Sequence, residues 1–83
     1  MAPHQPPDAR VDFVKLLWKL RTPKGRVLEC CLYRTEHGLE LRYGYSLGAP
    51  LVKEAVSRIE RADVVAQEWR DVMLMEPGYE EIR

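Results

Sequence analysis

The chain has 83 residues, of which 46% are apolar and 31% charged, and its thirteen basic and thirteen acidic side chains cancel. This length fits one domain and excludes two, and the composition is typical of a globular chain, not of a disordered one. No apolar run approaches the roughly 20 residues of a membrane span, and the first residues lack the basic and apolar regions of a secretory signal, so we expect a cytoplasmic protein without a membrane partner.

The first half of the chain predicts a tail followed by three strands. Residues 1–10 hold three of the six prolines and little apolar content, which indicates a flexible tail before a single domain at 11–83. Alternating runs near 14–21, 26–34 and 39–45 predict β-strands. Two segments of the form Thr-x-x-Gly, at 22–25 and 35–38, separate the runs and predict tight turns with a left-handed glycine. We therefore expect an antiparallel meander.

The turns also predict how the strands pair, if each turn threonine faces the residue after the glycine. Both resulting registers bring opposite charges together across the strands, which supports them. The predicted pairs are Thr22–Arg26, Leu20–Leu28, Lys19–Glu29, Trp18–Cys30 and Leu16–Leu32 in the first hairpin, and Thr35–Leu39, Arg34–Glu40, Tyr33–Leu41 and Cys31–Tyr43 in the second.

This register makes both faces of the predicted sheet apolar. One face would carry Leu16, Trp18, Leu20, Leu28, Cys30 and Leu32, and the other would carry Leu17, Val27, Cys31, Tyr33, Leu39, Leu41, Tyr43 and Tyr45. An antiparallel sheet covered by one helix normally has one wet face. The second apolar face therefore needs a partner, or a lid formed by residues 8–14 or 47–59.

The last third of the chain contains one ambiguous segment and one helix. Residues 51–59 fit a helical period after Pro50, but their β-branched residues also fit a fourth strand near 52–58, and the residues alone do not decide between the two. Apolar residues at helical spacing predict a helix near 61–75, which Pro77 and Gly78 end. We expect Val65, Trp69, Val72 and Met73 to dock on Leu16, Trp18, Leu28, Cys30 and Leu32. The predicted fold is α+β: a three- to four-stranded antiparallel β-meander with one C-terminal helix packed on one face.

Few residues could perform catalysis. The chain has two histidines, His4 in the predicted tail and His37 at a hairpin tip, and it has none of the common metal, phosphate-loop or nucleophile motifs. The adjacent Cys30 and Cys31 would form a strained bridge, so we interpret both as reduced packing residues, with a redox role as the alternative. We expect no enzymatic activity, no metal and no cofactor.

Two kinds of partner remain. The first is a second copy of the chain, or another protein, on the apolar face that holds Leu17, Cys31, Tyr33, Leu39, Leu41, Tyr43 and Tyr45. The alternative is nucleic acid, because residues 1–35 carry seven basic against three acidic side chains. That polyanion surface would consist of Lys15, Lys19, Arg21, Lys24 and Arg26, beside the tyrosines. A plainer explanation of the uneven charge is that the two halves of the chain attract each other when packed.

One family resemblance rests on structural motifs. The residues are Trp18 and Leu20, then Gly25-Arg26-Val27 and Cys30, then Gly38-Leu39-Glu40-Leu41-Arg42, then Ile59-Glu60, Ala62 and Glu68-Trp69-Arg70. Over roughly residues 16–82 this pattern resembles small uncharacterised single-domain bacterial proteins of ββββα order. The resemblance implies that residues 51–58 form a fourth strand, and it implies no activity.

Overall fold

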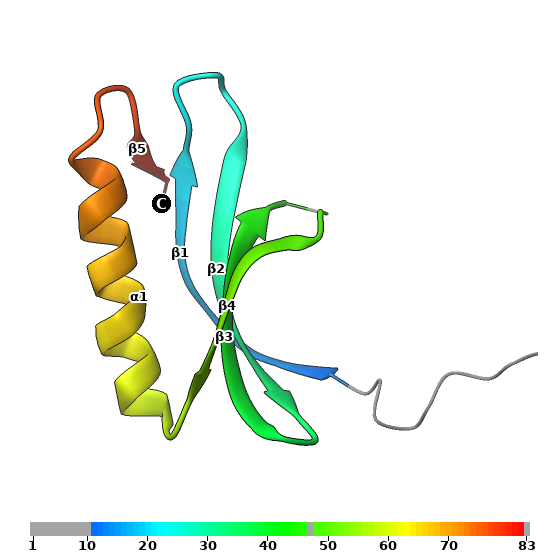
Figure 1. Ribbon diagram of the computed structural model, residues 1–83. Coiled ribbons are helices and arrows are strands. Elements are labelled where there is room, and N and C mark those ends of the chain that lie inside the picture. The colour runs from blue at the N-terminus through cyan, green and yellow to red at the C-terminus, as the bar shows by residue number, and fades with distance from the viewer. Residues whose placement is uncertain (1–10, 47, 83) are drawn as a thin grey trace, which may run out of the picture.

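The computed structural model describes residues 11–46 and 48–82, and the predicted tail at 1–10 lies outside them. It consists of one five-stranded antiparallel sheet and one helix, an α+β fold, as predicted (Figure 1). The elements are β1 (Val11–Arg21), β2 (Val27–Thr35), β3 (Gly38–Tyr45), β4 (Pro50–Val56), α1 (Ile59–Leu74) and β5 (Glu80–Ile82). The strand order is β4-β3-β2-β1-β5, so the strand count of three to four was too low. No helix of the described residues is both long and apolar enough to cross a membrane.

The two outer strands resolve what the sequence left open. β4 pairs with β3 along one edge, so residues 51–56 are strand and the helix begins only at Ile59. Pro50 is tolerated as the first residue of an edge strand because its missing N–H is not needed there. After α1 the chain turns back and β5 pairs with the end of β1, with Arg21 opposite Glu80. Three residues are too few to show an alternating pattern, which is why the sequence did not predict β5.

The first hairpin has the predicted register near its turn. The backbone N–H of Thr22 donates to the carbonyl of Arg26 at 2.7 Å, and Gly25 adopts a φ of +82°. The pairs Leu20–Leu28, Lys19–Glu29 and Trp18–Cys30 are confirmed. Further from the turn, β1 contains two register shifts, between Phe13 and Lys15 and between Leu16 and Trp18. Leu16 consequently pairs with Cys31, and its predicted pairing with Leu32 was wrong.

The second hairpin is displaced by one residue from the prediction. Thr35 pairs with Gly38 and not with Leu39, so Leu32 faces Leu41 and Cys30 faces Tyr43. A one-residue shift moves every side chain of β3 to the other face of the sheet. Here it places the apolar row of β3 beside the apolar row of β2, where both can be buried together. The predicted pairs Arg34–Glu40, Tyr33–Leu41 and Cys31–Tyr43 were therefore wrong.

The core lies between α1 and one face of the sheet. Its buried members are Trp18, Leu20, Leu28, Cys30, Leu32, Leu41, Val56, Ala62, Val65 and Ala66, with Trp69 and Met73 packed against them. The indole N–H of Trp18 donates to the carbonyl of Ala66 at 2.7 Å, which ties the helix to β1. The predicted docking was correct except at two residues: Val72 is 65% exposed, and Leu16 lies on the far face of the sheet.

Candidate interaction surface

The face of the sheet opposite α1 is the candidate site, and we call it the open face. The register assigns to it Val11, Phe13, Leu16, Lys19, Arg21, Val27, Glu29, Cys31, Tyr33, Thr35, Glu40, Arg42, Lys53, Ala55, Glu80 and Ile82. Within residues 11–46 and 48–82, α1 is the single helix, and it packs on the other face (Figure 1). Residues 11–14 and 50–56 extend β1 and β4 at their own places in the sheet. The lid considered for 8–14 or 47–59 is therefore not formed by the described residues of either segment.

On the open face, exposed apolar side chains gather on β1 and β2. The ring of Phe13 meets the ring of Tyr33 edge to face, with centroids 6.0 Å apart, yet Phe13 remains 61% exposed. Leu16 lies opposite Cys31 and is 44% exposed. Together with Val11 these residues form what we call the apolar strip: Val11, Phe13, Leu16, Cys31 and Tyr33. Aromatic and aliphatic side chains left exposed together are typical of an interface.

Charged side chains on the rest of the open face neutralise one another. Ion pairs join Lys19 to Glu29 at 3.7 Å, Arg21 to Glu80 at 3.9 Å and Arg42 to Glu40 at 2.6 Å. These three pairs involve all the charged residues that the register places on this face except Lys53. The guanidinium of Arg42 also lies 4.8 Å from the ring centre of Tyr33. The open face therefore presents little net charge to a partner.

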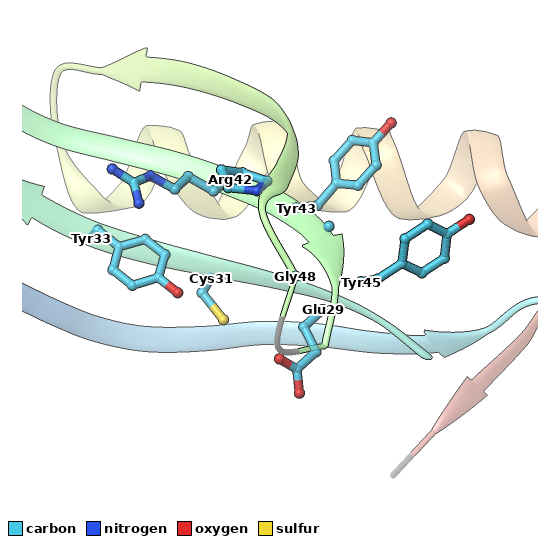
Figure 2. A pocket seen from close by; sticks show the side chains of 9 residues that line it. Glu29, Cys31, Tyr33, Arg42, Tyr43, Tyr45 and Gly48 are labelled. Atoms are coloured by element: carbon cyan, nitrogen blue, oxygen red, sulfur yellow. The ribbon is translucent and has the colours of Figure 1, made fainter. Parts of the chain in front are cut away.

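A hollow of about 320 Å³ lies beside the apolar strip. Figure 2 shows the residues that line it: Glu29, Cys31, Tyr33, Arg42, Tyr43, Gly44, Tyr45, Gly48 and Pro50. Burial raises the pKa of the Cys31 thiol, and this effect outweighs the hydrogen bond with Tyr33, which lowers it. The thiol therefore stays protonated at neutral pH and is a poor nucleophile. The hollow therefore offers hydrogen-bonding groups, among them a thiol that is not activated.

The sequence predicted the members of this surface only in part. Cys31 and Tyr33 lie on the open face, as expected, whereas Leu39, Leu41, Tyr43 and Tyr45 lie on the helix side because of the shifted second hairpin. Leu41 is fully buried, and Leu17 packs against the core. In Figure 2 the rings of Tyr43 and Tyr45 point away from the thiol of Cys31. These residues therefore do not share a face with Cys31 and Tyr33, contrary to the predicted register.

Three members of the apolar strip were missed for local reasons. The sequence placed Leu16 in the core, and it considered Val11 and Phe13 only as part of a lid. The placement of Leu16 assumes unbroken alternation along β1, but the register shift between Leu16 and Trp18 turns Leu16 to the open face. The second shift, between Phe13 and Lys15, restores the alternation, so Val11 and Phe13 were missed because the strand was predicted to begin only near residue 14. Such bulges re-aim side chains and are common on strands near a sheet edge. The usable signal was the excess of apolar residues over strict alternation at Val14, Leu16 and Leu17.

The structure also separates the predicted polyanion residues. Lys15 points to the helix side, where its Nζ lies 2.7 Å from Asp63. Lys19 and Arg21 lie on the open face in the ion pairs given above. Lys24 and Arg26 lie at the first turn, and the guanidinium of Arg26 stacks on Tyr45, 3.7 Å from its ring centre. The five cations therefore do not form one basic surface.

Comparison of the chain with protein-family models, with curated proteins and with solved structures finds no match. The resemblance to small bacterial ββββα proteins thus stays a prediction, although β4 agrees with the strand that it implied.

Proposed function

We propose that this protein is a non-enzymatic interaction module that works as a homodimer through its open face. The observation that carries the proposal is the apolar strip, in which Phe13 and Leu16 are exposed on the one face that α1 leaves uncovered. Burying an exposed phenylalanine and leucine stabilises a complex by about 1.5–3 kcal/mol each, before the cost of association is subtracted.

The charge pattern favours a second copy over a polyanion. Because the ion pairs Lys19–Glu29, Arg21–Glu80 and Arg42–Glu40 are satisfied within the chain, two open faces can approach without facing unpaired like charges. The same neutrality gives a polyanion little to bind on this face. Two antiparallel sheets also pack readily face to face. A two-fold axis near Leu16 would bring each apolar strip against the other, and such symmetric dimers are the commonest oligomers.

Light scattering coupled to size exclusion tests the proposal. We expect a solution mass near twice the 9.7 kDa of one chain, and a return to the monomer mass in Phe13→Glu. The matched control is Val72→Glu, since Val72 is 65% exposed against 61% for Phe13 but lies on the helix. The control should keep the dimer mass.

The results that contradict the proposal are equally direct. A parent chain that stays monomeric at the highest concentration attainable has no self-association to explain. A dimer that Val72→Glu disrupts and Phe13→Glu does not would place the interface on the helix. Neither side chain belongs to the buried core, so we expect both variants to fold. Circular dichroism of both variants checks that a change in mass is not caused by unfolding.

A further inference from the structure

A second hollow lies at the end of the first hairpin, away from the apolar strip. It has a volume of about 320 Å³, within the lower range of pockets that hold small ligands, which is about 300–1,000 Å³. Three separate parts of the chain line it: the first turn, the end of β3 and the segment before β5. The lining residues are Thr22, Pro23, Lys24, Arg26, Tyr45 and Tyr79.

The charged residues that line this hollow are all basic. Its lining contains two cations and no carboxylate. Among the described residues, neither Lys24 nor Arg26 takes part in an ion pair, unlike the other predicted polyanion residues Lys15, Lys19 and Arg21. In a chain of zero net charge, two neighbouring cations without acidic partners form a local site for an anion.

Planar groups accompany the two cations. The central carbon of the Arg26 guanidinium lies over the ring of Tyr45, 3.7 Å from the ring centre, and Tyr79 contributes a second, partly buried ring. Guanidinium planes and tyrosine rings are the surfaces on which nucleic-acid bases stack. Figure 2 shows Tyr45 on the side of the sheet opposite Cys31 and Glu29, so this hollow does not belong to the open face.

The position of Tyr79 is set by a close backbone contact. Gly78 has a φ of +93°, and a Cβ at this residue would lie 2.9 Å from Cγ of Pro23. Only glycine therefore lets the segment before β5 pack directly on the first turn. Thr22 is itself fixed, because its hydroxyl accepts a hydrogen bond from the backbone N–H of Arg26 at 3.2 Å. The two sides of the hollow are thus held together before any ligand arrives.

We propose that this hollow binds a nucleotide unit, with its phosphate at Lys24 and Arg26 and its base stacked on the tyrosine and guanidinium planes. The unit can be a free nucleotide or part of a single strand, since both present a phosphate and an aromatic base. This inference goes beyond the proposed homodimer and uses other residues, so either can fail without the other.

Fluorescence anisotropy with a labelled oligothymidylate of about ten nucleotides, and calorimetry with uridine monophosphate, test the inference at low salt. We expect binding that weakens as salt rises, and a salt slope that falls by about 1 in Lys24→Ala because one phosphate contact is lost. Tyr79→Leu should weaken binding by about tenfold through loss of stacking. Binding of both probes assigns the site to free nucleotides, and binding of the oligonucleotide alone assigns it to a single strand.

The control is Lys53→Ala, which removes an exposed cation from β4, at the opposite edge of the sheet. It should leave both affinities within about twofold of the parent. Absence of binding to both probes at low salt would overturn the inference. Equal losses in Lys24→Ala and Lys53→Ala would also overturn it, because they would show diffuse attraction without a site. Lys24 is a turn residue outside the core, so its variant remains informative even if Tyr79→Leu does not fold.

Discussion

The two faces of the sheet are stabilised in different ways. Under α1, the side chains of Leu20, Leu32 and Leu41 are fully buried and make the core. On the open face, side chains interact mainly in pairs across neighbouring strands, as Phe13 does with Tyr33 and Lys19 does with Glu29. Burial of apolar area contributes far more to folding than surface pairs do. Stability is therefore concentrated on one face, which leaves the residues of the other available for binding.

The same truncation on both faces should reveal the largest difference between them. Leu32→Ala should lower the free energy of unfolding by about 2–5 kcal/mol, because it empties a fully buried position. Leu16→Ala on the open face should cost less than about 1 kcal/mol. Urea denaturation of both variants in a Phe13→Glu background gives the numbers, and that background avoids stability gained by dimerisation. Equal losses would mean that the open face is covered after all.

The adjacent cysteines offer a second test, through pH. The pKa of Cys30 is raised from 9.0 to about 12, mainly by burial and to a lesser extent by the charge of Cys31. The folded state thus holds this proton more tightly than the unfolded state, so the stabilisation is complete below pH 9 and is lost as the pH rises from 9 toward 12. The full difference of three pH units corresponds to about 4 kcal/mol.

Urea denaturation at several pH values in that window checks this effect. The Cys30→Ala variant should lose stability less steeply above pH 9 than the parent, whatever its stability at neutral pH. Cys31→Ala is the matched control, and its slope should lie closer to that of the parent, because Cys31 is less deeply buried than Cys30. Parallel slopes in the parent and Cys30→Ala would contradict the buried position of Cys30.

A smaller effect is expected from the contact that anchors the helix on the covered face. Trp18→Phe keeps most of the apolar area but removes the N–H that donates to the carbonyl of Ala66. A buried carbonyl left without its donor costs about 1–3 kcal/mol. Thermal unfolding followed by circular dichroism measures the loss. A variant as stable as the parent would show that the carbonyl of Ala66 finds another donor.

The hairpins show what the sequence could predict and why. Both turns have the form Thr-x-x-Gly, but only the first has Pro23, which presets the backbone at its second position. Its register near the turn was predicted correctly. The second turn lacks this restriction, and its register follows from burying Leu41 beneath a helix that begins about twenty residues later. Local charge pairing pointed to the wrong register because it is weaker than that burial.

The residues of the candidate sites could likewise be predicted where strand pairing is regular, and not where it is irregular. Cys31 and Tyr33 were placed correctly because β2 alternates without interruption. Leu16 was missed because a register shift in β1 overrides alternation, and Phe13 was missed because the strand was predicted to begin only near residue 14. The second hollow could not be predicted from the sequence, because Tyr79 comes close to Lys24 only when β5, a strand of three residues, pairs with the sheet. A sequence predicts sites within one regular hairpin better than sites assembled from distant segments.

The smallest expected effect concerns the cohesion of the open face itself. Lys19 and Glu29 pair across strands at 3.7 Å and are both partly exposed. A double-mutant cycle with Lys19→Met and Glu29→Gln should give a coupling of about 0.2–1 kcal/mol that shrinks as salt is added. A larger, salt-resistant coupling would contradict the expectation that pairs on the open face are weak, since it would mean that this pair is shielded from water. In a dimer that shielding would come from the second open face, so the cycle is measured both in the parent and in Phe13→Glu. A coupling that falls only when the dimer is lost would place this ion pair inside the interface.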